Sequence, residues 1–290
     1  MAATGDGDGD KALEVGRGAP LDVGYCAEAL YNGELRHRYG DQVHILADAY
    51  HLSLLATLSS DKTTQPEINH LVTALYRDPV AFVLARELPT IEVASPTRMI
   101  AHTPQGVYRG RVVDPKTRVV CVDIARAGML PAQVCFDALN HVLDPQGVRQ
   151  DHLIMNRVTD AQGQVVGARI FGEKAGGEVA GQILVFPDPM GATGSSFLKA
   201  VGYYKNLAGG LPKKLITMNL IVTPEFVRNV RAAEPDAIIY AFRLDRGLSP
   251  GHVLATEPGT HPELERGLND HQYIVPGAGG LGEVINNVFV

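Results

Sequence analysis

A loop rich in glycine and hydroxyl side chains lies between an apolar strand and a helix in the second half of the chain. Residues 181–186 form an apolar run of strand length, and residues 194–207 repeat apolar side chains at helical spacing. Between them the chain reads Asp188-Pro189-Met190-Gly191-Ala192-Thr193-Gly194-Ser195-Ser196. A tight turn from a buried strand into a helix is typical of parallel α/β folds, whose ligands bind at such turns.

This loop has the chemistry of an anion site. Gly191 and Gly194 allow a tight turn that exposes backbone N–H groups, and Ser195 and Ser196 add hydroxyls where the helix starts. A helix N-terminus presents N–H donors and a partial positive charge, so a phosphate is stabilised there. Asp188 would instead bind ribose hydroxyls or a hydrated Mg²⁺. The alternative is an ordinary strand-to-helix turn capped by a serine.

Strands and helices alternate on both sides of the loop, which predicts βαβ units and a mostly parallel sheet flanked by helices. Residues 118–124 are largely β-branched, as in a parallel strand covered on both faces. The expected helices are 43–58, 66–88 with an interruption or kink at Pro79, 128–143, 194–207 and 224–233. The expected strands are 90–93, 107–113, 118–124, 152–156, 181–186, 215–222 and 237–242, with a hairpin over 157–171.

Composition excludes some classes of function. The chain has 290 residues, 45% hydrophobic and 20% charged, enough for one large domain or two modest ones. A formal net charge of −6 argues against a general binder of nucleic acid or acidic membranes, so phosphate binding has to come from local geometry. No apolar run approaches the roughly 18–20 residues that span a bilayer.

The N-terminus and the cysteines suggest where the protein works. Residues 1–20 are rich in Gly and Asp, which predicts a disordered tail, and they lack the pattern of a signal peptide. Cys26, Cys121 and Cys135 have neither metal-knuckle nor redox-pair spacing. Buried structural thiols in a reducing cytoplasm are the simplest interpretation.

Two arginines follow neighbouring predicted strands. Arg126 comes after the strand over 118–124 and Arg157 after the strand over 152–156. Since the carboxyl ends of parallel strands share one edge, both could converge on one anion, whose oxygens match the guanidinium fork. Surface arginines with solvated head groups are the alternative. Asp123 could orient Arg126 or cap a turn.

These segments together resemble the uracil phosphoribosyltransferase family. Residues 188–196 are similar to its phosphoribosyl-diphosphate loop, in which a proline, here Pro189, replaces the second of two adjacent acids. Ile124-Ala125-Arg126-Ala127-Gly128 resembles its Leu-Arg-Ala-Gly segment, and Asn156-Arg157 its Tyr-Arg pair before a hairpin arm. Residues 267–277 resemble its uracil-binding signature, and the similarity spans about residues 43–287.

The resemblance implies a type I phosphoribosyltransferase fold in one domain over residues 21–290, with a hairpin arm and a small hood formed by parts of 21–110 and 245–290. It implies transfer of the phosphoribosyl group from 5-phosphoribosyl diphosphate to uracil, giving UMP and diphosphate in pyrimidine salvage. Mg²⁺ would be carried by the substrate rather than held by protein ligands. The hairpin would embrace a second subunit in a homodimer or higher homo-oligomer; a free flap over the site is the alternative.

The resemblance also assigns site residues. Asp188, Arg126 and Arg157 would be catalytic. The phosphoribosyl-diphosphate site would comprise Arg126, Arg157, Asp188, Pro189, Met190, Gly191, Ala192, Thr193, Gly194, Ser195, Ser196 and Gly280. Ile274, Gly279, Gly280 and Leu281 would bind uracil. Their segment is short of polar side chains, so backbone N–H and C=O groups would match uracil, and cytosine would mispair at roughly 1–3 kcal/mol per buried group. A glycine-rich hinge without a ligand is the alternative.

The chain also departs from the family pattern. The family carries an acid where this chain has Gly280 and an arginine where it has Ser60, and an insertion follows Leu248. Two other functions therefore remain open. One is a non-catalytic sensor or regulator that binds phosphoribosyl diphosphate or a nucleotide, and the other is a phosphoribosyltransferase for another base.

Overall fold

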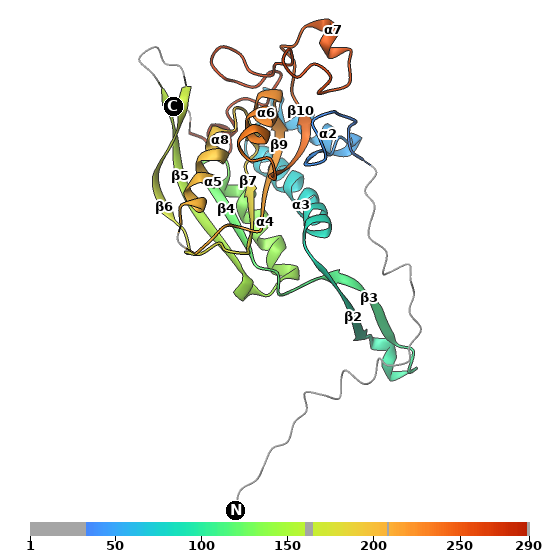
Figure 1. The fold of residues 1–290 in the computed structure, drawn as a ribbon. Coiled ribbons are helices and arrows are strands. Elements are labelled where there is room, and N and C mark those ends of the chain that lie inside the picture. Colours follow the sequence, from blue (N-terminus) through green and yellow to red (C-terminus); the bar gives the residue numbers. More distant parts are fainter. Residues whose placement is uncertain (1–32, 160–164, 208, 289–290) are drawn as a thin grey trace, which may run out of the picture.

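One central sheet organises the computed structural model, which describes residues 33–159, 165–207 and 209–288 (Figure 1). Its strands follow the order β1-β10-β9-β7-β4-β5-β6, and β8 also pairs with β9. Neighbouring strands are parallel except β6, which is antiparallel to β5. The predicted mostly parallel sheet is confirmed. The strands are β1 (Val43–Ile45), β4 (Val119–Ala125), β5 (Val148–Thr159), β6 (Val165–Lys174), β7 (Ile183–Pro187), β8 (Met190–Gly191), β9 (Lys214–Val222) and β10 (Ile238–Leu244).

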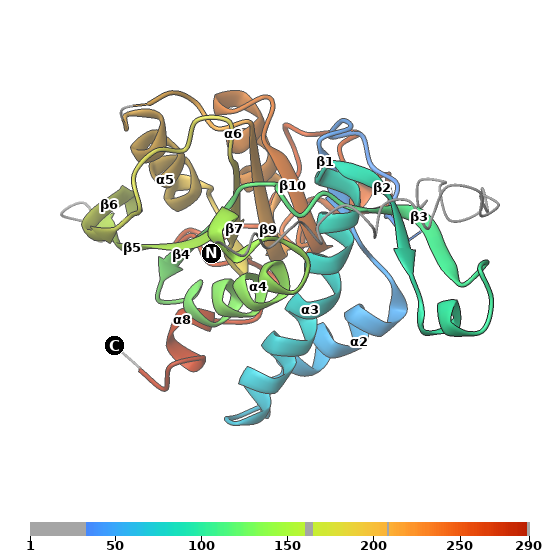
Figure 2. The ribbon, with the colours of Figure 1, turned by 90° about the horizontal axis from the view of Figure 1, so that it is seen from below.

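Helices cover both faces of this sheet (Figure 2). Alternate residues of β4 belong to different cores, Val119 and Cys121 to one and Val120 and Val122 to the other. A sheet buried on both faces requires such continuously apolar strands. The helices on the first face are α2 (Ala49–Leu58), α3 (Glu67–Glu87) and α4 (Met129–Val142), and those on the second are α5 (Ser195–Lys205) and α6 (Pro224–Ala233). None of the helices in the described residues is long and apolar enough to cross a bilayer.

The first predicted helix is wrong over its opening residues. Val43–Ile45 form β1, which pairs with β10 at the edge of the sheet. Asp48 then caps α2, its carboxylate accepting a hydrogen bond from the His51 N–H at 3.0 Å. Tyr50, which the helical spacing places on the apolar face, is 61% exposed. A strand of three residues is too short for its alternating pattern to be distinguished from the four-residue apolar spacing of the helix that follows.

Pro79 does not interrupt α3, so the interruption expected from the sequence is wrong, and the kink given as its alternative stays a prediction. The helix is continuous from Glu67 to Glu87, and Pro79 is buried inside it. A proline inside a helix costs about 3 kcal/mol. On either side of it Tyr76, Val80 and Val83 are buried in the core, and full burial of one such apolar side chain contributes about 1.5–3 kcal/mol. Packing therefore outweighs the local preference.

Two hairpins extend from the body of the protein. The strands predicted near residues 90 and 107 are β2 (Thr90–Pro96) and β3 (Val107–Val113), which form a separate antiparallel pair standing away from the central sheet (Figure 1). The short helix η2 (Arg98–Ala101) follows β2. The second hairpin is β5–β6, and it is longer than the hairpin predicted over 157–171, with a turn outside the described residues. The strand predicted over 152–156 is part of β5, so Arg157 lies inside a strand and the expectation that it follows a strand end is wrong. The predicted tail over 1–20 and Cys26 also lie outside them.

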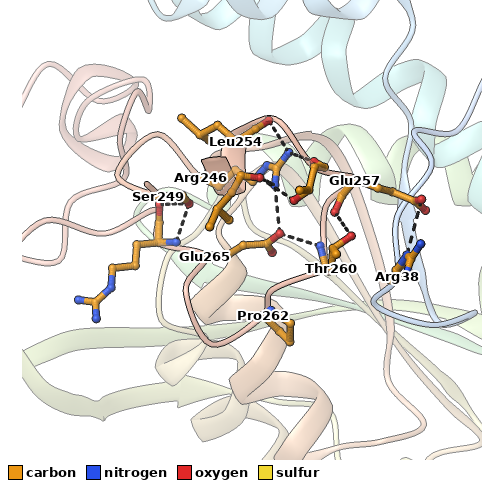
Figure 3. A network of polar contacts seen from close by, with 12 residues as sticks. Arg38, Arg246, Ser249, Leu254, Glu257, Thr260, Pro262 and Glu265 are labelled. Atoms are coloured by element: carbon orange, nitrogen blue, oxygen red, sulfur yellow. Dashed lines mark hydrogen bonds and ion pairs between the residues drawn. The ribbon is translucent and has the colours of Figure 1, made fainter. Parts of the chain in front are cut away.

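The insertion over residues 248–266 is organised around one buried carboxylate (Figure 3). Glu265 is fully buried, and its Oε1 accepts hydrogen bonds from Arg246 Nη1 at 3.0 Å and from the Gly259 N–H at 2.8 Å. Arg246 also donates to backbone carbonyl oxygens between residues 253 and 256, at the end of the short helix α7 (Gly251–Leu254). The insertion is therefore tied to the strand end that precedes it.

Candidate functional site

A cavity of about 610 Å³ opens where strands β4 and β7 end, beside the second half of β5. Ligands bind at this edge in open α/β sheets because helix N-termini and strand-end side chains face it. Residues 124–127 and 154–156 form part of its wall, and the phosphate loop, residues 188–196, contributes another part. The base loop, residues 273–282, completes the lining together with the start of the short helix α8 (Leu281–Val284).

The phosphate loop is held from behind through its carbonyl oxygens. Backbone N–H groups of Leu220 and Ile221 donate to Pro189 O at 3.0 and 3.1 Å. Because the N–H and C=O of a peptide unit point in opposite directions, this arrangement turns backbone N–H groups of the loop toward the cavity, as an anion site requires. Further hydrogen bonds of 2.5, 2.6 and 2.9 Å run from the side chains of Asn219, Thr223 and Asn229 to the carbonyl oxygens of Asp188, Ala192 and Thr193.

Two glycines permit the close packing of this loop. A Cβ at Gly191 would lie 2.9 Å from Val222 Cγ1, inside van der Waals contact. Gly194 has a left-handed φ of +80° and is the residue before the first turn of α5. The alternative of a serine-capped turn is therefore wrong, because the N-cap is a glycine and Ser195 begins the helix. The Ser195 N–H at the start of α5 donates to Thr193 Oγ1 at 3.3 Å, and Gly194 itself has no side chain to cap the helix.

Most of the predicted ligand-binding residues line this space. Pro189 and Gly191 do not line it but attach the loop to β9. Pro189 O accepts hydrogen bonds from β9, and Gly191 pairs with that strand. The side chain of Arg157 lies outside the described residues, so its contact stays a prediction. The large cavity contains Arg126, Asp188, Met190, Ala192, Ser196, Ile274, Gly279, Gly280 and Leu281, and an adjoining pocket of about 50 Å³ adds Thr193, Gly194 and Ser195.

Arg126 reaches the cavity from the turn between β4 and α4. A Cβ at Gly128 would lie 2.9 Å from both the N and the O of Ile124 and 3.2 Å from Pro187 O. Only a glycine lets this turn pack directly on the end of β7. The turn therefore brings Arg126 to the same cavity as Asp188, which follows β7.

Asp123 has a different partner from the one that the sequence suggests. Its Oδ2 lies 2.8 Å from His152 Nδ1, on the residue directly opposite in β5. Burial raises the pKa of the Asp123 carboxyl, and the bond to His152 offsets this only in part. The expectation that Asp123 orients Arg126 or caps a turn is wrong, because strand register sets its partner.

A partly buried ion pair, Arg243–Asp245, positions the base loop. Arg243 Nε donates to Asp245 Oδ1 at 2.6 Å, and Asp245 Oδ2 accepts from the Gly277 N–H at 2.7 Å. Arg243 Nη2 in turn donates to Gly277 O at 2.9 Å. The end of β10 thus holds both backbone groups of Gly277 and fixes the start of the segment that leads to Gly280. Leu281 is 1% exposed, and its side chain packs in the core beneath the loop.

Gly267→Ala is expected to displace the base loop. A Cβ there would lie 2.1 Å from Asp245 O and 2.9 Å from Thr223 Cβ, and both atoms belong to the frame beneath the loop. Overpacking of this kind costs about 1–3 kcal/mol or more, so we expect the Tm to fall by about 5 °C and ligand affinity to fall with it. Gly251→Ala is the matched control, because a Cβ there meets nothing within 4 Å. Equal Tm values for the two variants would contradict the prediction.

Several residues that line the cavity are not among those predicted from the sequence. Asn156 directly precedes Arg157 and could have been found from that neighbour. Gln272 has a φ of +60°, unusual for a residue other than glycine, and no sequence pattern signals this. Glu283 follows the glycines of the base loop. The additional lining residues are Ile124, Ala125, Ala127, Ile154, Met155, Asn156, Gln272, Tyr273, Gly282 and Glu283.

Comparison with known families agrees with this arrangement. The sequence model described as uracil phosphoribosyltransferase matches residues 48–261. The chain belongs to the uracil phosphoribosyltransferase family. The sequence-based assignment to this family is confirmed, and with it the type I phosphoribosyltransferase fold. The match ends before the base loop. The assignment of the base-loop glycines to the site therefore depends on the geometry described above.

Named members of the uracil phosphoribosyltransferase family cover most of the chain. The uracil phosphoribosyltransferase of Acidovorax sp. (strain JS42) is 29% identical over 206 residues, which span 71% of this chain and 79% of that protein. The one from Acinetobacter baylyi is 28% identical over 240 residues, or 76% of this chain and 93% of that protein. Among solved structures, the AQ2163 protein from Aquifex aeolicus matches with a TM-score of 0.64 at 20% identity, covering 86% of this chain and 99% of that one.

Proposed function

We propose that the protein transfers the phosphoribosyl group of 5-phosphoribosyl diphosphate to uracil, giving UMP and diphosphate. One observation carries the proposal: the phosphate loop, the strand-end side chains Asp188 and Arg126, and the base loop all line one cavity of about 610 Å³. That volume suits a small ligand. The relatives named as uracil phosphoribosyltransferases support the choice of base.

Each part of the cavity suits one part of the phosphoribosyl donor, 5-phosphoribosyl diphosphate. The N-terminus of α5, with the hydroxyls of Thr193, Ser195 and Ser196, would bind the 5-phosphate. Asp188, an acceptor at the end of β7, would bind the ribose hydroxyls. Arg126, with Arg157 as its expected companion, would bind the diphosphate through guanidinium forks.

The chemistry then depends mainly on positioning. N1 of uracil forms a bond to C1 of the ribose, the bond from C1 to the diphosphate oxygen breaks, and the N1 proton is released to solvent. Positive charge develops at C1 and negative charge on the leaving diphosphate. Asp188 and Arg126 face these charges from fixed positions, and holding the two reactants together supplies much of the remaining acceleration.

The oxygen atoms that line this cavity are suitable ligands for Mg²⁺. The carboxylates of Asp188 and Glu283 line it, and carboxylate oxygens, directly or through water, are ligands that Mg²⁺ accepts. Within the described ranges, no group of three or more His, Cys, Asp or Glu side chains forms a site of its own. In this proposal the ion arrives with the substrate's phosphates and neutralises charge on the leaving diphosphate.

The base loop would read uracil through main-chain groups. Gly279 has a left-handed φ of +71°, and Gly280 has no side chain, so the main chain forms this wall of the cavity. Alternating backbone donors and acceptors match the two carbonyls and the N–H of uracil, whereas cytosine would leave groups unpaired.

A homodimer or higher homo-oligomer in the cytoplasm belongs to the same proposal. The hairpin β5–β6 exposes large apolar side chains, with Val158 38% and Phe171 59% exposed, which a second subunit would cover. Sedimentation equilibrium would test this assembly. Cys121 and Cys135 are buried free thiols, as the sequence predicts, and they suit a reducing compartment.

The purified protein should convert labelled uracil to UMP when 5-phosphoribosyl diphosphate and Mg²⁺ are supplied. Parallel reactions with cytosine, adenine and hypoxanthine would test the choice of base. Chromatographic separation of nucleotide from base gives the readout. Turnover of another base alone would assign a different transferase. Retained binding of the diphosphate without any nucleotide product would support the sensor or regulator that the missing acid at Gly280 leaves open.

A further inference from the structure

A second carboxylate lines the cavity on a different wall from Asp188. Glu283 is the third residue of α8 and lines the space together with Gly279 and Gly280. It is half-buried, and within the described part of the chain its carboxylate makes no hydrogen bond or ion pair. A charged group in this position is available to a ligand.

The position of Glu283 depends on the missing side chain at Gly280. A Cβ at residue 280 would lie 2.9 Å from Glu283 Oε2 and 3.2 Å from its Cδ. Residues three apart in a helical turn lie on the same face, so the longer side chain reaches back over the glycine. The Glu283 carboxylate therefore occupies the space that a side chain at residue 280 would fill.

We propose that Glu283 binds the hydrated Mg²⁺ of the Mg²⁺–phosphoribosyl diphosphate complex, in place of an acid at residue 280. This inference rests on the proposed function. A carboxylate in a cavity built for a polyanion repels the phosphates unless a cation lies between them. Asp188 and Glu283, on two walls of one cavity, provide oxygen ligands on two sides for such a cation.

A purely structural role for Glu283 makes different predictions. A glutamate three residues after the N-cap can reach back to the N-cap backbone, and glutamine serves this purpose equally well. The Glu283→Gln substitution therefore preserves such a contact and removes only the charge. If the role is structural, Glu283→Gln leaves ligand binding unchanged or weakens it with and without metal alike.

Isothermal titration calorimetry of the full-length protein with 5-phosphoribosyl diphosphate, with and without Mg²⁺, would test the proposal. Glu283→Gln should weaken binding of the Mg²⁺ complex by about tenfold or more, since hydrogen bonds to charged groups contribute at that level. Binding of the metal-free diphosphate should be unchanged or tighter, because one repulsive charge is gone. Glu263→Gln, at an exposed acid in the insertion, is the control and should behave like the wild type.

A second variant tests the position of the carboxylate. Gly280 has a φ of −80°, which any L-residue adopts, so Gly280→Asp in the Glu283→Gln background should restore tighter binding of the Mg²⁺ complex. A double variant as weak as the single one, or a Glu283→Gln variant with wild-type affinity for the complex, would overturn the inference. Wild-type protein that binds no 5-phosphoribosyl diphosphate would instead refute the proposed function itself.

Discussion

Asp188→Asn is expected to lower kcat/KM for UMP formation by about 10²–10³-fold while the fold stays intact. Loss of one preorganised charged group in an active site has effects of this size. The substitution keeps the shape of the side chain, and the Asp188 carbonyl can still accept from Asn219 at 2.5 Å. Steady-state assays of UMP formation give the kinetic change, and thermal unfolding reports on the fold.

Asp236→Asn is the matched control for this change. Asp236 is exposed in the turn before β10, away from the residues that line the cavity. It should retain the kinetics and the Tm of the wild type. Full activity of Asp188→Asn would refute the catalytic role of this carboxylate, whereas a large fall in Tm would show that the side chain supports the loop rather than the reaction.

Glu265→Ala should have the largest effect on stability. The carboxylate is fully buried, and it pairs with Arg246 and accepts from the Gly259 N–H (Figure 3). Removing one partner of a buried ion pair leaves an uncompensated charge and costs about 3–5 kcal/mol. For a chain of this length we expect the Tm to fall by roughly 10 °C.

Glu263→Ala gives the comparison for this prediction, because Glu263 lies two residues earlier and is exposed. Its Tm should stay within about 1 °C of the wild type, as is usual for surface substitutions. Thermal and urea unfolding of both variants would test the expectation. A Glu265→Ala protein as stable as Glu263→Ala would show that the network around Arg246 adds little to the fold.

The sequence predicted the long elements well because their apolar patterns are strong. The helix over 224–233 and the strand over 107–113 have the predicted bounds in α6 and β3. The failures occurred where tertiary packing opposed local preference. β1 is three residues long and forms only against β10, and α3 continues through Pro79 because the core around it is well packed.

The same division applies to the candidate site. The phosphate loop was recognisable because glycines and hydroxyls at fixed spacing are a local property of the chain. Asp123 was assigned the wrong role because its partner, His152, is set by the register of β4 against β5. Glu283 was overlooked because its position over Gly280 depends on the path of a short turn.

By itself, the sequence determined the alternation of strands and helices, the phosphate loop and the family, since each depends on residues close together in the chain. Only the tertiary structure decided that Arg126, Asp188 and Glu283 line one cavity. It also decided that the Arg243–Asp245 pair holds Gly277 and that the insertion folds around Glu265. Contacts between distant segments follow from sheet register and from how closely backbones approach, and no local pattern contains that information.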